Sequence, residues 1–492
     1  MTDLEQLTSW HSNWRDLRAV VFGLGVSGFS AADTLAELGA TTLVVAEKAE
    51  AELLDILDVI GVPHLTGGAA TGVPVAVVDF KPDVIIVSPG IRPQNELLLW
   101  AAATGVAVWV DIDLAWRLRD KTERLAHWFT ITGTNGKTTT VQLLTAMLNQ
   151  GGIRAEACGN IGKPILDAIR DPEGFDALVV ELSSFQLHYL GEIYPFSSAV
   201  LNLADDHLDW HGGFEAYREA KAKVYENTIA ACVYNVMDKA TETMVEDADV
   251  VDGARAIGFT LGIPTRSQVG FVEDILCDRA FLDDRANNAL EIATLEDLSE
   301  IGVLTPHLMA NTAAATALAR SAGVEPGAIR EAVRNFRLDS HRIELVAEAA
   351  DIRWIDDSKA TNPHAADASL ASFEKIIWIV GGLLKGVDIA PLVKRHADKI
   401  SAAIVIGADR TAVLEALAAN APGVPVHEVR AESGAAVMNE AIYAAANFAR
   451  GGDVVLLAPA AASMDQFEDY ADRGNRFAEA VRQEIRGSSG QG

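Results

Sequence analysis

Short apolar runs alternate with amphipathic segments along nearly the whole chain. Runs such as Val84–Val87 and Val454–Leu457 have the length of buried strands, and apolar residues recur at helical spacing between such runs. This alternation is typical of α/β domains with mostly parallel sheets. The chain has 492 residues, which favours about three domains of that kind.

The pattern divides into three stretches of strands and helices. We expect the first domain over residues 1–123, the second over 124–338 and the third over 339–492, with a polar linker at 117–124. The first two domains are expected to be a Rossmann-like sheet and a central P-loop-type ATPase sheet, and the third a second Rossmann-like sheet. Expected strands are 20–22, 42–45, 75–78, 84–87, 106–110, 127–131, 177–180, 199–203, 231–234, 353–355, 376–380, 403–406, 426–429 and 454–457. Expected helices include 29–38, 141–148 and 311–320, while 239–302 is expected to hold shorter strands and loops.

Charge and composition exclude several classes of function. The formal net charge is −29, which argues against a surface that binds nucleic acid or anionic membranes. Three widely spaced cysteines make neither a disulfide framework nor a zinc pattern, as expected in a reducing cytoplasm. No apolar run reaches the roughly 18 residues of a membrane helix, and the first residues do not resemble a signal peptide.

The segment Ile131–Thr140, ITGTNGKTTT, carries the strongest chemical signal. It lies between an apolar strand pattern and a helical pattern, in the layout of a loop that binds nucleoside triphosphates. Backbone N–H groups at the helix start face phosphates, Lys137 meets the β/γ-phosphate charge, and the Thr138 hydroxyl suits Mg²⁺. The spacing departs from the usual motif, because the early glycine is Gly133 and Ile131 holds the expected position.

A second glycine motif, Gly23–Gly28, follows the first strand and opens a helix, with Glu47 at the end of the next strand. This is the dinucleotide fingerprint, yet the same geometry suits any diphosphate, including a UDP-sugar, and also a plain tight turn. Another turn, Ser88-Pro-Gly90, follows the strand at 84–87. Both turns are expected at the carboxyl ends of parallel strands, where ligands bind in open α/β sheets.

Polar residues follow further strands of the second domain. Glu181 ends an apolar strand and is well placed to hold Mg²⁺ near the phosphate loop. His207, among Asp205, Asp206 and Asp209, is a candidate metal ligand or phosphate contact. Lys221, in contrast, lies in a helical pattern that predicts a solvated surface lysine.

Three polar loops also follow strands of the third domain. They are Asp357–Thr361, Gly381–Gly386 and Ala460–Ser463. Their joint position describes a ligand-binding edge, and Lys359, Lys385 and the Ser463 hydroxyl suit recognition of a carboxylate.

Several of these sequence motifs, taken together, resemble those of the Mur ligase family. These are ATP-dependent ligases that build the peptide stem of bacterial peptidoglycan. The resemblance rests on Thr132–Thr138, Gly159–Gly162, Glu181–Gln186, Asp206–Asp209, Asp357–Asn362 and Ala460–Phe467, which span nearly the whole chain. The N-terminal glycine loop and the segments 357–362 and 463–470 are most similar to the family member that joins D-glutamate to UDP-N-acetylmuramoyl-L-alanine. The resemblance therefore implies these two compounds as substrates. It further implies a cytoplasmic, monomeric enzyme of cell wall biogenesis, cell shape and cell division, with no nucleic-acid or membrane partner.

The resemblance also implies roles for individual residues. For catalysis it points to Lys137, Glu181, His207 and Lys221, with two Mg²⁺ held by Thr138, Glu181, His207 and Lys221, the last as an N-carbamoyl lysine. For ATP it points to Gly133, Thr134, Asn135, Gly136, Lys137, Thr138, Thr139, Asn311, Arg342 and Asp357. For the two substrates it points to Val26, Ser27, Glu47, Ser88, Pro89, Gly90, Asn160, Ser183, His207, Lys359, Thr361, Lys385, Ser463, Met464 and Tyr470.

Two positions depart from the family pattern. Ala46-Glu47 stands where an aspartate often follows the second strand, and Tyr470 stands where phenylalanine is familiar. The implied reaction forms an acyl phosphate from the substrate carboxylate and ATP, and the amine of D-glutamate then displaces phosphate. Candidate hinges for domain closure lie at 117–124 and 335–341. The alternatives are another family ligase, such as folylpolyglutamate synthase, an NAD-dependent oxidoreductase built on Gly23–Gly28, and a non-catalytic nucleotide-binding scaffold.

Overall fold

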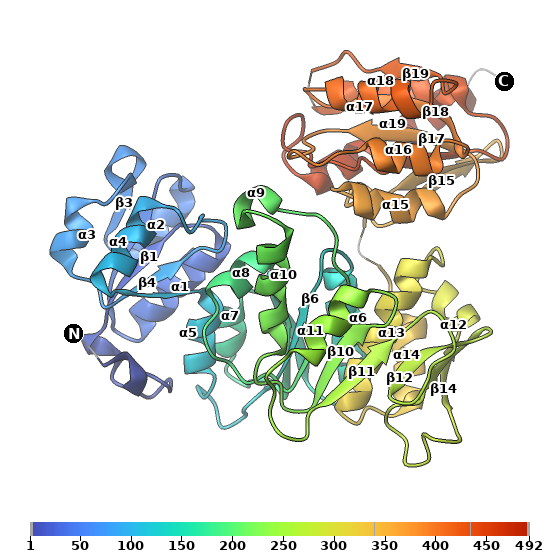
Figure 1. Cartoon of the computed structure of the whole chain (residues 1–492). Helices are drawn as coiled ribbons and strands as arrows, with labels where there is room; N and C mark the ends of the chain where they lie inside the picture. The colour runs from blue at the N-terminus through green and yellow to red at the C-terminus, as the bar shows by residue number, and fades with distance from the viewer. Residues whose placement is uncertain (1–2, 339, 433, 490–492) are drawn as a thin grey trace. The chain divides into compact units, whose positions relative to one another are not determined.

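The computed structural model describes residues 3–338, 340–432 and 434–489 (Figure 1). The chain forms two compact units, one of Met1–Leu203, Trp210–Ala293 and Ala310–Ala332, the other of Ala204–Asp209, Thr294–Met309 and Val333–Gly492. Each of the three sheets falls inside one of the predicted domain ranges. The expected start of the third domain at Asp339 lies outside the described residues, as do the ends of the chain.

The first sheet has the parallel order β3-β2-β1-β4-β5, as expected for a Rossmann-like domain. Its central strands are buried along their length, which explains their continuous apolar sequence. The strands are β1 (Arg18–Phe22), β2 (Thr41–Ala46), β3 (His64–Thr66), β4 (Val84–Val87) and β5 (Ala107–Trp109). The helices are α1 (Val26–Glu37), α2 (Ala51–Val59), α3 (Val75–Phe80), α4 (Glu96–Thr104) and α5 (Asp111–Leu118), with short η1 (Leu4–Gln6), η2 (Trp14–Asp16) and η3 (Gly67–Ala70).

Two expectations for this domain were wrong. The strand expected at 75–78 is the helix α3, which begins after Pro74 and ends at Lys81 in the left-handed region. Its valines suggested a strand, but only Val77 is buried, whereas Val75 is 74% exposed. The linker expected at 117–124 begins inside α5, where the Arg117 guanidinium lies 4.1 Å from the Trp109 ring centroid.

The second sheet has the order β14-β13-β12-β11-β10-β9-β6-β8-β7 and is parallel from β7 to β12. Its strands are β6 (His127–Thr132), β7 (Ala155–Gly159), β8 (Ala177–Glu181), β9 (Ser197–Val200), β10 (Ala231–Asn235), β11 (Arg255–Phe259), β12 (Gln268–Val272), β13 (Ile275–Asp278) and β14 (Leu290–Thr294). Its helices are α6 (Lys137–Gln150), α7 (Ile165–Ile169), α8 (Ser184–Tyr189), α9 (Leu208–His211), α10 (Phe214–Ala222), η4 (Lys223–Tyr225), α11 (Lys239–Glu246), α12 (Leu295–Ser299), α13 (Pro306–Ser321) and α14 (Pro326–Asn335).

A buried ion pair ties α13 to β13. Arg320 Nε donates to Asp278 Oδ2 at 3.0 Å, and the two side chains are 9% and 0% exposed. Arg320→Ala is expected to lower the free energy of unfolding by about 3–5 kcal/mol, because it leaves a buried carboxylate without its cation. Urea denaturation measures the change.

The control is Arg330→Ala on α14. Arg330 pairs with Glu291 at 3.4 Å, and these side chains are 35% and 53% exposed. A surface pair of this kind contributes no more than about 1 kcal/mol. Equal losses in the two variants would contradict the assignment of Arg320 and Asp278 as a supporting pair.

The third sheet has the order β15-β16-β20-β17-β18-β19, with only the β15–β16 pair antiparallel among the described pairings. Separate apolar clusters cover its two faces, one including Leu370, Leu392 and Leu417 and the other Met438 and Phe477. The strands are β15 (Glu344–Ala349), β16 (Ile352–Asp356), β17 (Ile376–Gly381), β18 (Ile400–Ile406), β19 (Val426–Glu428) and β20 (Val454–Leu457). The helices are α15 (Pro363–Ala371), α16 (Ala390–His396), α17 (Thr411–Asn420), α18 (Gly434–Phe448) and α19 (Tyr470–Ser489).

Within the described residues, no helix combines the length and the apolar character needed to cross a bilayer.

Candidate active site

The glycine loop between β6 and α6 has the geometry of a phosphate-binding turn. Gly136 precedes the first residue of α6 with φ +85°, a conformation that favours glycine. A Cβ atom added at Gly136 would lie 2.3 Å from Asn311 Oδ1, so the loop and α13 approach each other closely. The structure thus brings Asn311, an expected ATP contact, against the loop.

Hydrogen bonds hold the loop from several sides. The Lys137 Nζ donates to the carbonyl oxygens of Gly133 and Thr134 at 2.8 and 3.0 Å, so this side chain folds over the loop. Asn202, which sequence reasoning did not single out, accepts from Asn135 N and donates to Asn135 O at 2.9 and 3.0 Å. Asn202 lies two residues after the end of β9, and this position was the available signal, since polar residues at strand ends meet at one edge of a sheet.

The expected Mg²⁺ ligands Thr138 and Glu181 lie together. Thr138 Oγ1 donates to Glu181 Oε2 at 3.0 Å, and Asn160 Nδ2 donates to Glu181 Oε1 at 3.0 Å. Glu181 is 3% exposed, so this carboxylate stands at a nearly dry site beside the phosphate loop. A hydroxyl and a carboxylate are oxygen donors of the kind that Mg²⁺ takes, and the pair therefore fits the expected ion.

Lys221 is not a solvated surface lysine. Its side chain is 2% exposed, and Nζ donates to Thr132 Oγ1 and Gly133 O at 3.1 and 2.9 Å. The ammonium also lies 5.0 Å from the ring centroid of Tyr217, whose hydroxyl is 2.9 Å from Thr134 Oγ1. The Lys221 amine therefore lies at the phosphate loop, and its expected role as a carbamoylated metal ligand stays a prediction.

His207 belongs to the second of the two compact units. It has φ +53°, a left-handed conformation that is uncommon for a residue with a side chain. Its Nε2 lies 3.6 Å from Asp206 Oδ2. Backbone strain of this kind clusters at functional sites, which keeps His207 a candidate.

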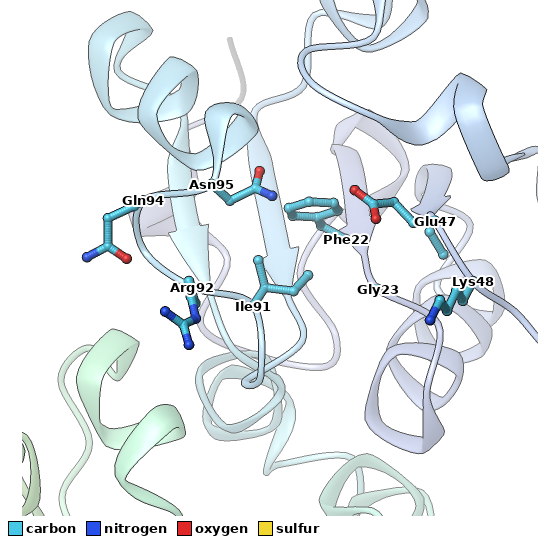
Figure 2. Close-up of a pocket in the computed structure, with 9 residues that line it drawn as sticks. Phe22, Gly23, Glu47, Lys48, Ile91, Arg92, Gln94 and Asn95 are labelled. Atoms are coloured by element: carbon cyan, nitrogen blue, oxygen red, sulfur yellow. The ribbon is translucent and has the colours of Figure 1, made fainter. Parts of the chain in front are cut away.

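The first glycine loop borders a pocket of about 550 Å³ (Figure 2). In the figure, Glu47 and Lys48 lie on one side of Phe22, and Asn95, Ile91 and Arg92 lie on the other. Glu47, an expected substrate contact, therefore lines a pocket beside the glycine loop. Sequence reasoning missed Lys48 and Arg92, although each follows a motif that it had singled out.

The turn at Ser88 packs directly against this glycine loop. A Cβ added at Gly23 would lie 2.5 Å from Ser88 Oγ, and one added at Gly28 would lie 2.1 Å from Gly23 O. A second pocket of about 420 Å³ adjoins the same turn and is lined in part by Val26, Ser27, Ser88 and Pro89. Glycines at positions 23 and 28 are therefore required by close packing, which the fingerprint alone left open.

Ser183 has a clear local role at the start of α8. Its hydroxyl accepts from Gln186 N at 3.1 Å, and Ser183 N donates to Gln186 Oε1, so the two residues form a capping box. This contact fixes the helix that follows Glu181. The expected substrate role of Ser183 stays a prediction.

The expected residues of the third domain fall on the loops after β16, β17 and β20, except for Arg342, which precedes β15, and Tyr470, the first residue of α19. Lys359 Nζ lies 5.0 Å from the Tyr470 ring centroid, so these two expected contacts lie side by side. Ser463 is buried at 3% exposure, whereas Met464 is 74% exposed. Arg342 is half-buried before β15, and Thr361 and Lys385 lie on the loops that follow β16 and β17.

Asp357 is a buried carboxyl group in the second unit. Burial raises its pKa from 3.8 to about 7, although Ser369, whose hydroxyl donates to Asp357 Oδ2, and Arg342 favour the charged form. The folded protein therefore holds this proton more tightly than the unfolded chain does. The resulting stability is complete below pH 3.8 and is lost as the pH rises through about 7.

Asp357→Asn is therefore expected to flatten the pH dependence of stability. Between about pH 5 and about pH 8 the melting temperature of the unchanged protein falls more than that of the variant, because only the former must release this proton. Scanning calorimetry at both pH values measures the difference. Parallel shifts in the two proteins would contradict a raised pKa at Asp357.

Sequence reasoning also missed a polar cluster beside Asp357. His341 Nδ1 lies 2.7 Å from Asp356 Oδ2, and this hydrogen bond raises the pKa of His341. Arg473, fully buried, donates to Ser358 Oγ and Ser358 O at 2.9 and 2.7 Å. These contacts fix the loop that carries Asp357 and Lys359, and they join segments too distant in sequence to be paired by pattern.

Comparison with known proteins relates the chain to one family over nearly its whole length. Sequence models match the Mur ligase MurD-like N-terminal domain over residues 17–110, the Mur ligase middle domain over 131–319 and the Mur ligase glutamate ligase domain over 341–461. A relative from Leifsonia xyli subsp. xyli, named UDP-N-acetylmuramoylalanine--D-glutamate ligase, is 57% identical, covering 99% of this chain and 97% of the relative. A relative of the same name from Streptomyces avermitilis is 48% identical, covering 96% and 99%.

Solved structures agree at the level of the fold. UDP-N-acetylmuramate-alanine ligase from Thermotoga maritima has a TM-score of 0.55 at 18% identity, covering 95% of this chain and 100% of that one. MurF ligase from Thermotoga maritima, solved in complex with ADP, has a TM-score of 0.56 at 17% identity, covering 99% and 100%. With relatives this similar over its full length, the chain belongs to the Mur ligase family.

Proposed function

We propose that this protein is an ATP-dependent ligase that joins D-glutamate to UDP-N-acetylmuramoyl-L-alanine in peptidoglycan precursor synthesis. The arrangement of Thr138 and Glu181 beside the Lys137 loop supports an ATP site, because it gathers a hydroxyl, a carboxylate and a cation at one sheet edge. The printed name of relatives up to 57% identical supports the two other substrates.

The first step transfers phosphate to the sugar substrate. An oxygen of the L-alanyl carboxylate attacks the γ-phosphorus, the bond to the bridging oxygen of ADP breaks, and an acyl phosphate forms. Lys137 leaves its loop carbonyls and offsets the negative charge on the transferring group. Bound Mg²⁺ would supply further charge neutralisation, held by Thr138 and Glu181, with His207 and a carbamoylated Lys221 as the proposed ligands of a second ion.

The second step forms the amide. The amine of D-glutamate, after losing a proton, attacks the acyl carbon, and inorganic phosphate leaves with the electrons of the broken C–O bond. We assign Lys359, Lys385 and Ser463 to the D-glutamate carboxylates, since two cations and a hydroxyl suit two anionic groups. Thr361, Met464 and Tyr470 complete this proposed pocket, and Asn311, Arg342 and Asp357 are the proposed nucleotide contacts.

The pocket beside Gly23 is the proposed site of the UDP moiety. Lys48 and Arg92 add positive charge where a diphosphate needs it, and Glu47 offers a carboxylate to donors on the uridine. Because this pocket lies within the range matched by the MurD-like N-terminal domain, the oxidoreductase interpretation of the glycine motif is disfavoured. We further propose domain boundaries at residues 123/124 and 338/339 and a monomeric, cytoplasmic enzyme.

Phosphate release tests the assignment. The purified protein is supplied with ATP, Mg²⁺ and UDP-N-acetylmuramoyl-L-alanine, and release is compared between D-glutamate, L-glutamate and a diamino acid. Rapid release with D-glutamate alone, together with an amide product of matching mass, is the expected result. Release with L-glutamate or a diamino acid alone would favour another ligase of the family.

A further inference from the structure

The loop Ser88–Arg92 forms part of the two pockets described beside the first glycine loop. Ser88 and Pro89 line the smaller one, and Ile91 and Arg92 line the larger one (Figure 2). The loop belongs to neither a strand nor a helix, and a hydrogen bond from Ile91 N to Ser88 O closes it as a turn. A wall built from such a loop needs support from elsewhere if the pocket is to keep its shape.

Two aromatic side chains that lie beyond the first sheet provide that support. The Tyr189 hydroxyl, at the end of α8, donates to the carbonyl oxygen of Ile91 at 2.7 Å. Trp210 Nε1, in α9, donates to the carbonyl oxygen of Gly90 at 3.3 Å. Successive carbonyl groups of the loop thus accept from two rings of the same unit.

The two donors are themselves held in place. Trp210 is 6% exposed, and its ring lies 4.6 Å from Phe185, 6.1 Å from Tyr189 and 4.6 Å from His211, between ring centroids. His211 is anchored in turn, because its Nε2 lies 3.0 Å from Ser184 Oγ at the start of α8. Rings fixed by packing lose little freedom when they donate, so their hydrogen bonds restrain the loop effectively.

We propose that Tyr189 and Trp210 are positioning residues for the UDP-sugar substrate, acting through the backbone of Ser88–Arg92. This inference rests on the proposed function, since it takes the pockets beside Gly23 as the UDP site. A loop that is already ordered spares the ligand the cost of ordering it, which tightens binding without any contact between the ligand and the two rings. Without the donors, the substrate has to order the loop and binds more weakly.

The test compares two tyrosines that each lose one hydroxyl. Tyr189→Phe removes the hydrogen bond to Ile91, whereas Tyr194→Phe removes one from an exposed hydroxyl to Glu192 at 2.5 Å and serves as the control. A hydrogen bond of about 0.5–1.5 kcal/mol corresponds to a rise of about two- to twelvefold in KM for the UDP-sugar with Tyr189→Phe. KM for ATP and for D-glutamate, and kcat, are expected to stay at the unchanged values.

Trp210→Phe keeps an aromatic ring in the cluster and removes the second donor, so it is also expected to raise KM for the UDP-sugar. Calorimetry with UDP alone supplies a readout independent of turnover, with the same loss of affinity expected for Tyr189→Phe. A KM for the UDP-sugar that matches that of Tyr194→Phe overturns the inference, as does an equal rise in all three KM values. If the unchanged protein neither binds UDP nor consumes ATP with the sugar substrate, the proposed function itself fails.

Discussion

Lys137→Ala is expected to lower D-glutamate-dependent phosphate release at least about 10³-fold. In the structure, Lys137 Nζ donates to the carbonyl oxygens of Gly133 and Thr134, so the ammonium group already lies at the phosphate-binding loop. Phosphoryl transfer offers the protein little covalent chemistry, and positioned positive charge supplies much of the rate. Removing that charge therefore affects the transition state more than the binding of ATP.

The separate effects of Lys137→Ala on kcat and on ADP binding distinguish this role from a structural one. We expect kcat to fall while the dissociation constant of ADP changes by less than about tenfold, because the backbone N–H groups of the loop and α6 remain. Lys239→Ala is the control, since Lys239 is 77% exposed and pairs only at the surface with Glu242. A Lys137→Ala protein that keeps a tenth of the original kcat would contradict the assignment of this loop.

The central strands of the sheets follow from the sequence because these strands are buried on both faces. Val84–Val87 and Ala177–Val180 are apolar at every position, and β4 and β8 include these residues. The same argument fails at Val75–Val78, where equally apolar residues form the mostly exposed helix α3. Local composition does not indicate whether a neighbouring strand is available for pairing. A short valine-rich run is therefore compatible with either a strand or a helix.

Part of the site follows from one topological rule. Because polar residues after parallel strands meet at one edge, Glu181 and the Thr138 loop could be expected together, and they lie at hydrogen-bonding distance. Lys221 could not be found in this way, since it lies on a helix and is identified only by what packs over it. The pairing of His341 with Asp356 has no local signal either, because the two residues meet only in the folded domain.

Lys221→Arg is expected to lower the rate of amide formation at least about 10²-fold, if Lys221 acts as a carbamate ligand of Mg²⁺. The carbamate forms when the neutral amine attacks CO₂ and a proton leaves, which converts a cation into a carboxylate-like ligand. Arginine keeps the positive charge and the capacity to donate to Thr132 and Gly133, the contacts that the amine makes in the structure. Because Lys221 is buried, the bulkier arginine also disturbs packing, so a loss of rate alone does not separate a metal ligand from a structural lysine.

Carbon dioxide provides the second readout for Lys221. Depleting CO₂ is expected to lower the rate of the unchanged enzyme, and added bicarbonate is expected to restore it, while the Lys221→Arg protein responds to neither. Lys223→Arg is the matched control, because Lys223 lies two residues further on and donates to the exposed carbonyl of His188 at 3.0 Å. An unchanged enzyme indifferent to CO₂, or a Lys221→Arg protein as active as Lys223→Arg, would show that the buried amine serves the loop as a cation and that the second metal takes its ligands elsewhere.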